Sequence, residues 1–105
     1  MWDKELKNKY ERQFSTYVYH GFIVKGLNGY GYIILFHDFP ECGATENFKE
    51  IAINNVFAYL KKEVLNLLQK KELMPEASTK DFLINAYRDY EIIDWIEFPL
   101  NQFLQ

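Results

Sequence analysis

Two β-rich segments separated by an Asn-Gly pair constrain this chain more than any other feature of its sequence. The segments, residues 17–25 and 30–37, consist mainly of Tyr, Val, Phe, Ile and Gly and show no helical periodicity. Both residues of Asn28-Gly29, which lies between them, tolerate the positive φ that a type I′ turn requires, so the pattern predicts a β-hairpin. The almost continuously apolar residues 32–36 are typical of a central strand buried on both faces.

A long amphipathic helix is predicted after the hairpin, from about residue 47 to residue 71. Apolar side chains recur at helical spacing throughout this stretch. Lysines gather toward its C-terminal half, as the helix dipole favours. Thr45 or Asn47 is the expected N-cap. Residues 44–45 are expected to form a short third strand before the helix.

Smaller elements are predicted at the two ends of the chain. Residues 1–14 place Trp2, Leu6 and Tyr10 at helical spacing, which gives a helical extension with one narrow apolar stripe.

The C-terminal part is predicted to hold a short helix and a strand. The helix spans residues 79–87, with Ser78 and Asp81 as a capping pair. Residues 90–98 are expected to be the last strand. A proline at position 99 then ends the strand, and residues 99–105 are expected to form a short tail.

The order of these elements predicts an α+β fold in a single domain, residues 1–105. The simplest arrangement is an antiparallel sheet of three to four strands with the long helix packed on one face. The elements follow the order β-β-β-α-β along the chain, after an N-terminal helix. A chain of 105 residues has no room for two ordinary cores.

Composition excludes several classes of protein. An aromatic share of 18% supplies enough apolar surface to order the chain. A net charge of -3 disfavours general nucleic-acid binding, so we expect no direct DNA binding. A single Cys excludes an intrachain disulfide. No apolar run is long enough to span a membrane, and the charged N-terminus lacks the apolar core of a signal peptide. We therefore expect a cytoplasmic protein.

Three short motifs occur in order along residues 31–78. They are a turn containing Asp38, Phe39, Pro40 and Cys42, a helix signature containing Ala52 and Asn55, and the loop Pro75-Glu76-Ala77-Ser78. In this order and spacing they resemble the HicB antitoxin-like family, whose domain is a partial RNase H-like α+β fold. Four positions depart from the family's pattern: His37 and Ala77 stand in place of prolines, and Glu41 and Glu46 in place of glycines.

The resemblance implies a protein-binding role. In the family this domain typically forms a homodimer and binds HicA, a small basic toxin that degrades mRNA, covering its RNA surface or its active histidine. An acidic chain suits a basic partner because complementary potentials speed and orient association. Many family members also carry a C-terminal DNA-binding domain. Only seven residues follow residue 98 here, too few for such a domain.

The residues themselves also suggest catalytic alternatives. His20, His37, Asp38 and Cys42 could form a thiol or metal site, but their spacing is unlike that of zinc ligands. The favoured explanation is that Cys42 is a small buried apolar residue and that Asp38 caps the backbone amides of its own turn. A nuclease needs converging carboxylates to hold metal ions, and the two predicted hairpin strands contain none. We expect no catalytic site, metal or cofactor.

The aromatic strands are the expected contact surface for a partner. The hairpin tyrosines could stack RNA bases, but only Lys25 supplies a positive charge nearby, so cross-strand packing or protein contact suits them better. The expected partner surface comprises Tyr17, Tyr19, Tyr30, Tyr32, Asp94 and Glu97. Asn55 is expected to tie the long helix to the turn at residues 40–43.

The sequence thus favours a non-catalytic module that binds and neutralises a HicA-type toxin. The alternative is an orphan HicB-like dimer with a regulatory or ligand-binding role and no toxin partner. A small nuclease is a third and weaker hypothesis.

Overall fold

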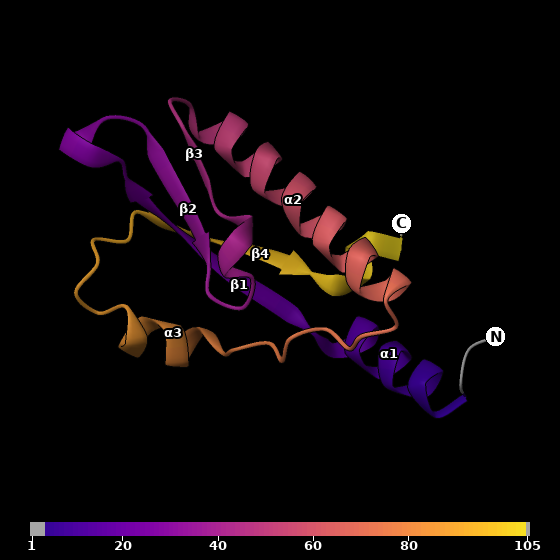
Figure 1. Cartoon of the computed structure of the whole chain (residues 1–105). Coiled ribbons are helices and arrows are strands. Elements are labelled where there is room, and N and C mark those ends of the chain that lie inside the picture. Colours follow the sequence, from indigo (N-terminus) through magenta and orange to yellow (C-terminus); the bar gives the residue numbers. More distant parts are fainter. Residues whose placement is uncertain (1–3, 105) are drawn as a thin grey trace.

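The computed structural model describes residues 4–104 and confirms the predicted α+β class. Four strands form one antiparallel sheet in the order β3-β2-β1-β4, with a helix before the sheet and one on each of its faces (Figure 1). The strands are β1 (Val18–Lys25), β2 (Tyr32–Phe36), β3 (Ala44–Glu46) and β4 (Asp94–Pro99), and the helices are α1 (Lys4–Thr16), α2 (Lys49–Gln69) and α3 (Lys80–Ala86). Among the described residues no helix has both the length and the hydrophobicity to span a bilayer.

The long helix α2 covers one face of the sheet and supplies four buried residues of the core. Its buried side chains recur every four residues, at Ala52, Val56, Leu60 and Val64. They belong to the same core cluster as the inward-pointing strand residues, which are Tyr19, Ile23, Ile34, Phe36, Ala44 and Phe98. The apolar side chains on one face of α2, which recur with the helical period of about 3.6, therefore pack against the alternate strand residues that point to the same face of the sheet.

Strand β1, rather than β2, is buried on both faces. In β1 the neighbouring residues Phe22 and Ile23 are both 0% exposed, although they point to opposite faces. In β2 only Ile34 and Phe36 are buried. β2 is a central strand, as predicted, but it is not buried on both faces. The short α3 lies over β1 on the second face, where the Phe22 and Tyr87 ring centroids are 4.7 Å apart, and it leaves part of β2 uncovered.

The hairpin turn has the predicted chemistry within a wider loop. Asn28 has φ 60° and Gly29 has φ 76°, and the N–H of Tyr30 donates to the carbonyl of Leu27 at 3.3 Å. These features are those of a type I′ turn. Residues 26–31 all lie outside the two strands, so β2 begins at Tyr32, two residues later than predicted.

Both ends of α2 differ from the prediction. The helix begins at Lys49 behind Phe48, without a side-chain cap, because Thr45 and Glu46 belong to β3. It ends at Gln69 in a Schellman motif: the N–H of Lys71 donates to Leu68 and that of Glu72 to Leu67. The C′ position of this motif needs a positive φ, and Lys71 adopts φ 58° there.

Helix α1 packs on its own domain. Tyr10 and Phe14 are buried in the core cluster, and the Tyr10 hydroxyl donates to the carbonyl of Glu72. The side-chain amide of Gln13 donates to the carbonyl of Met74 at 3.2 Å and accepts from its N–H at 3.1 Å. The apolar stripe predicted for this helix thus continues to Phe14. Its predicted first member, Trp2, lies outside the described residues.

The C-terminal strand and tail also differ from the prediction. The N–H groups of Tyr90 and Ile92 donate to Tyr87 and Tyr90 within the loop, and only that of Ile93 donates to β1, at Ile23, so β4 begins at Asp94. Pro99 is the last residue of β4 and pairs with Val18, as an edge strand allows. The predicted tail begins with a short 3-10 helix whose first residue, Leu100, is 0% exposed and donates its N–H to Tyr17. Leu100 is therefore part of the core, whereas Asn101 and Gln102 are exposed.

Candidate functional site

The turn motif and the loop motif are joined by Asp38. One carboxylate oxygen of Asp38 accepts from the backbone N–H of Ser78 at 2.9 Å, and the other accepts from its hydroxyl at 2.6 Å. The prediction that Asp38 caps the amides of its own turn is wrong. Ser78 is consequently not the cap of α3, since Thr79 accepts from the N–H of Phe82 instead. The two motifs form one structural unit that fixes where α3 begins.

Two further residues of the turn motif, Phe39 and Cys42, lie in the core, whereas Pro40 is exposed. Phe39 is buried edge-on against Tyr19, with ring centroids 4.7 Å apart. Pro40 opens a single 3-10 turn that ends at Cys42, where the N–H of Cys42 donates to the carbonyl of Phe39 at 2.9 Å. This turn carries the chain from β2 into β3, so its residues shape the sheet edge and expose little chemistry.

The thiol of Cys42 is poorly suited to nucleophilic attack. Cys42 is 4% exposed and its sulfur lies 3.6 Å from the carbonyl of Tyr59, toward which the thiol donates. Burial first, and then the carboxylates of Glu63 and Glu41, raise the pKa of the thiol to about 11. The reactive thiolate is therefore scarce near neutral pH. The role as a small buried apolar residue, which the sequence favoured, agrees with this environment.

The two histidines do not join Cys42 in a site. His37 Nδ1 lies 2.7 Å from the Tyr87 hydroxyl, and its ring packs edge-on against Phe82, so it belongs to the α3 side of the sheet. His20 lies on β1, and its Nδ1 is buried without a hydrogen-bond partner. Within residues 4–104 no three His, Cys, Asp or Glu side chains come together in a way that could hold a metal ion.

The helix motif also has a packing role. Ala52 is 0% exposed and lies where α2 meets the sheet. Asn55 is half-buried and donates to the Glu46 carboxylate at 2.9 Å. Asn55 thus connects α2 to the end of β3. The prediction that Asn55 would connect the helix to the turn at residues 40–43 is wrong.

The predicted aromatic contact residues are dispersed. Tyr19 is 0% exposed, and its hydroxyl donates to the carbonyl of Pro75 at 2.6 Å, so it is a core residue and cannot contact a partner. Tyr17 and Tyr32 are half-buried against the same core, and the Lys25 ammonium lies 4.4 Å from the Tyr32 ring centroid. Only Tyr30 is largely exposed, at 82%, and it lies in the hairpin loop.

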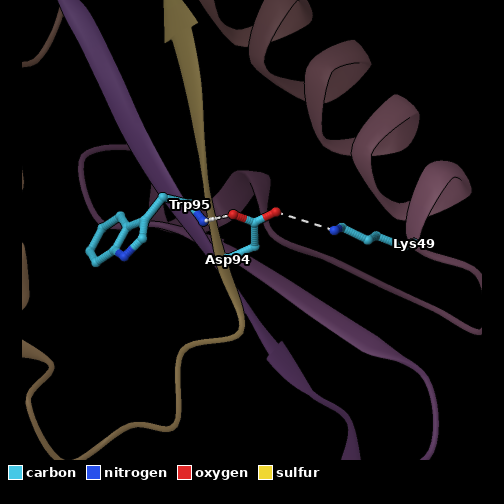
Figure 2. A network of polar contacts seen from close by, with 3 residues as sticks. All are labelled: Lys49, Asp94 and Trp95. Carbon is cyan, nitrogen blue, oxygen red and sulfur yellow. Dashed lines mark hydrogen bonds and ion pairs between the residues drawn. The ribbon is translucent and has the colours of Figure 1, made fainter.

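The two predicted acidic contacts point to opposite faces of β4. Asp94 lies on the α2 side, where its carboxylate accepts from the N–H of Trp95 at 2.8 Å and from the Lys49 ammonium at 3.2 Å (Figure 2). The Trp95 bond first, and then Lys49, hold the pKa of Asp94 below its ordinary value. Glu97, three residues later, is exposed on the α3 side. The six predicted contact residues therefore form no single surface.

One group of exposed apolar side chains was missed. Phe82, Ile84, Tyr90 and Ile93, on α3 and in the loop that follows it, are each 46–52% exposed. A signal was available in the sequence, because Phe82-Leu83-Ile84 are three consecutive apolar residues in a short helix and only one side of a helix can face the sheet. Leu83 takes the buried position, at 0% exposed.

The sheet order β3-β2-β1-β4 and the long helix on one face define an α+β domain. The crystal structure of the N-terminal domain of Burkholderia pseudomallei antitoxin HicB matches this chain with a TM-score of 0.66 and 18% sequence identity. The match covers 78% of this chain and 95% of that domain. No protein-family model and no curated protein sequence matches the chain. At this identity the likeness establishes the fold, which is the fold that the motifs indicated.

Proposed function

We propose that this chain is a non-catalytic protein-binding module that acts as a HicB-type antitoxin toward a HicA-type, mRNA-degrading toxin. The observation that carries the proposal is the fold match, which extends over 95% of the HicB N-terminal domain. The match includes nearly all of a domain described as part of an antitoxin. A binding role also agrees with the net charge of -3, because a basic RNA-binding toxin would be attracted to an acidic chain.

Three of the four polar groups that could have served catalysis, namely Asp38, Cys42 and His37, are engaged in structural contacts, which supports a non-catalytic role. The Asp38 carboxylate accepts two hydrogen bonds from Ser78. The Cys42 thiol is buried with a raised pKa. His37 is bonded to Tyr87. Each group is thus held by the fold in an arrangement that opposes reaction with a substrate.

The proposal carries three further expectations. The protein forms a homodimer, which light scattering behind a sizing column would detect. It acts in the cytoplasm, where an mRNA-degrading toxin has its substrate, and it does not itself bind DNA. A monomer at high concentration would count against the dimer without affecting the toxin-binding proposal.

Co-expression tests the function directly. A HicA-type toxin from the source genome is induced in a host cell with or without this chain, and growth is followed together with the amount of intact mRNA. We expect this chain to restore growth and to co-purify with the toxin as a stable complex. Absence of both growth rescue and a complex would reject the antitoxin role. If the chain were still a dimer, that result would favour the orphan regulatory domain.

A further inference from the structure

The net negative charge of the chain is concentrated on the side of the sheet that carries α3. The segment from residue 76 to residue 97 contains six carboxylates and only two cations, Lys80 and Arg88. One of the six, Asp94, lies on the α2 side and is paired with Lys49. The remaining five are Glu76, Asp81, Asp89, Glu91 and Glu97. The other ten acidic and ten basic residues of the chain cancel, so these five carboxylates together with Lys80 and Arg88 account for the formal charge of -3.

Exposed apolar side chains lie among these carboxylates. We define the α3 surface as Phe82, Ile84, Tyr90 and Ile93 together with Glu76, Asp81, Asp89, Glu91 and Glu97. Phe82 and Glu76 line one shallow pocket of about 230 Å³. Tyr90, Glu91 and Ile93 line another of about 500 Å³, together with Lys25. Each pocket thus combines an apolar side chain with a carboxylate.

The α3 surface is held firmly, which favours binding because little ordering is lost on contact. Asp38 fixes the residue that precedes the N-cap of α3 through two hydrogen bonds. Tyr87, at the other end of α3, packs against Phe22 and Tyr90 with ring centroids 4.7 and 5.2 Å apart. The Lys80 ammonium lies 5.2 Å from the Trp95 ring centroid, so Lys80 and the exposed Arg88 offset two of the five carboxylates on this side. Figure 1 shows α3 on the face of the sheet opposite α2.

We propose that the α3 surface docks a basic face of a partner protein, with the apolar side chains at the centre of the contact and the carboxylates at its rim. Charge selects this occupant among the possible ones. Nucleic acid would place phosphates against carboxylates. A second copy related by a two-fold axis would place the same acidic rim against itself. The identity of the partner as a HicA-type toxin rests on the proposed function, whereas the position of the contact rests on this surface.

Binding measurements with a purified HicA-type toxin, inactivated by substitution of its active histidine, test the proposal. The charge variant is Asp89→Lys with Glu91→Lys, and its matched control is Glu11→Lys with Glu50→Lys on α1 and α2. At low salt we expect the association rate to fall about tenfold or more for the charge variant and less than about threefold for the control. The difference should shrink as salt is raised.

The apolar centre is tested separately. The variant Phe82→Ala with Ile84→Ala is compared with Ile51→Ala and Leu65→Ala, which are exposed to 46% and 47% on α2. We expect Kd to rise about tenfold for the α3 variant and to stay within about threefold for the control. Circular dichroism of each variant establishes that the fold is retained. Alanine suits both helices, so these changes should not unfold the protein.

The outcomes separate this inference from the proposed function. If the wild-type chain binds the toxin and the α3 variants bind equally well, the toxin uses another surface and the inference is overturned while the function stands. If the α3 variants instead turn a dimer into a monomer, the surface is a homotypic interface and the inference is also overturned. If the wild-type chain does not bind the toxin, the proposed function fails and this assignment fails with it.

Discussion

Replacing Asp38 by alanine is expected to destabilise the fold through Ser78, forty residues away in the sequence. Asp38 is half-buried and receives two hydrogen bonds, at 2.9 and 2.6 Å. A hydrogen bond to a charged group contributes about 1.5–3 kcal/mol, and partial exposure favours the lower end of that range. Asp38→Ala removes both bonds and should lower the free energy of unfolding by about 3 kcal/mol. Ser78→Ala removes only the hydroxyl bond and should cost about 1.5 kcal/mol.

The double variant gives the decisive number. Once Asp38 is absent the Ser78 hydroxyl has no carboxylate to bind, so Ser78→Ala should add little to Asp38→Ala. The expected coupling energy of the cycle is therefore about 1.5 kcal/mol. In urea, with a slope of about 1.5 kcal/mol per molar for a domain of this size, the midpoint should fall by about 2 M for Asp38→Ala and about 1 M for Ser78→Ala.

Urea unfolding at about 25 °C, followed by tryptophan fluorescence and circular dichroism, measures these midpoints. Asp89→Ala, which removes an exposed carboxylate from the same face, serves as the control and should change stability by less than about 0.5 kcal/mol. Additive losses in the cycle would show that Asp38 and Ser78 do not interact in solution. The structural unit that joins the turn motif to α3 would then be wrong.

Three further predictions concern other sites. Iodoacetamide should alkylate Cys42 at pH 8 roughly a hundredfold more slowly in the native protein than in urea, because burial raises its pKa from 9.0 to about 11; equal rates would contradict the buried thiol. Tyr19→Phe removes the bond to Pro75 and should cost about 1.5 kcal/mol below pH 9. Burial raises the pKa of Tyr19, so its contribution to the stability of the fold is complete below the pKa of 10.0 in the unfolded chain and declines at higher pH. Above that pH the urea midpoint should therefore fall less steeply with pH for Tyr19→Phe than for the wild type. Lys71→Gly should stabilise the fold by about 1 kcal/mol, because only glycine adopts the positive φ at this helix end without strain; a urea midpoint equal to that of Lys71→Ala would refute this reason.

Features that depend on neighbouring residues could be predicted from the sequence. The Asn28-Gly29 turn follows from the preference of two residues for positive φ. The buried face of α2 follows from a four-residue repeat. The closing strand was found, although its start was placed four residues early. Residues 90–93 are as apolar as a strand, but the N–H groups of Tyr90 and Ile92 donate within the loop and only that of Ile93 donates to β1.

Contacts between residues far apart in the sequence could not be predicted in the same way. Asp38 accepts hydrogen bonds from Ser78 and not from nearer amides, because the fold places the loop that contains Ser78 beside it. The fold likewise places Glu46 beside Asn55. Tyr19 shares its residue type with the exposed Tyr30, and only the position of α2 and of Pro75 decides that it is buried. The residue type indicates which environment a side chain prefers, whereas the tertiary structure determines which residues it contacts.

The residues that carry the family resemblance and the residues that would carry function are therefore different sets, and variants can separate them. Asp38, Cys42 and Ala52 make contacts inside the domain, so their presence accounts for the fold and leaves the partner undetermined. Leu83 fills the buried position of α3, whereas Phe82 and Ile84 are about half exposed and Phe82 contacts the ring of His37 only at its edge. The exposed apolar residues on both sides of Leu83 raise the risk of aggregation, and a role in binding a partner would explain why they are present. Phe82→Ala with Ile84→Ala should accordingly weaken toxin binding at nearly unchanged stability, whereas Asp38→Ala should lower stability first and binding only as a consequence.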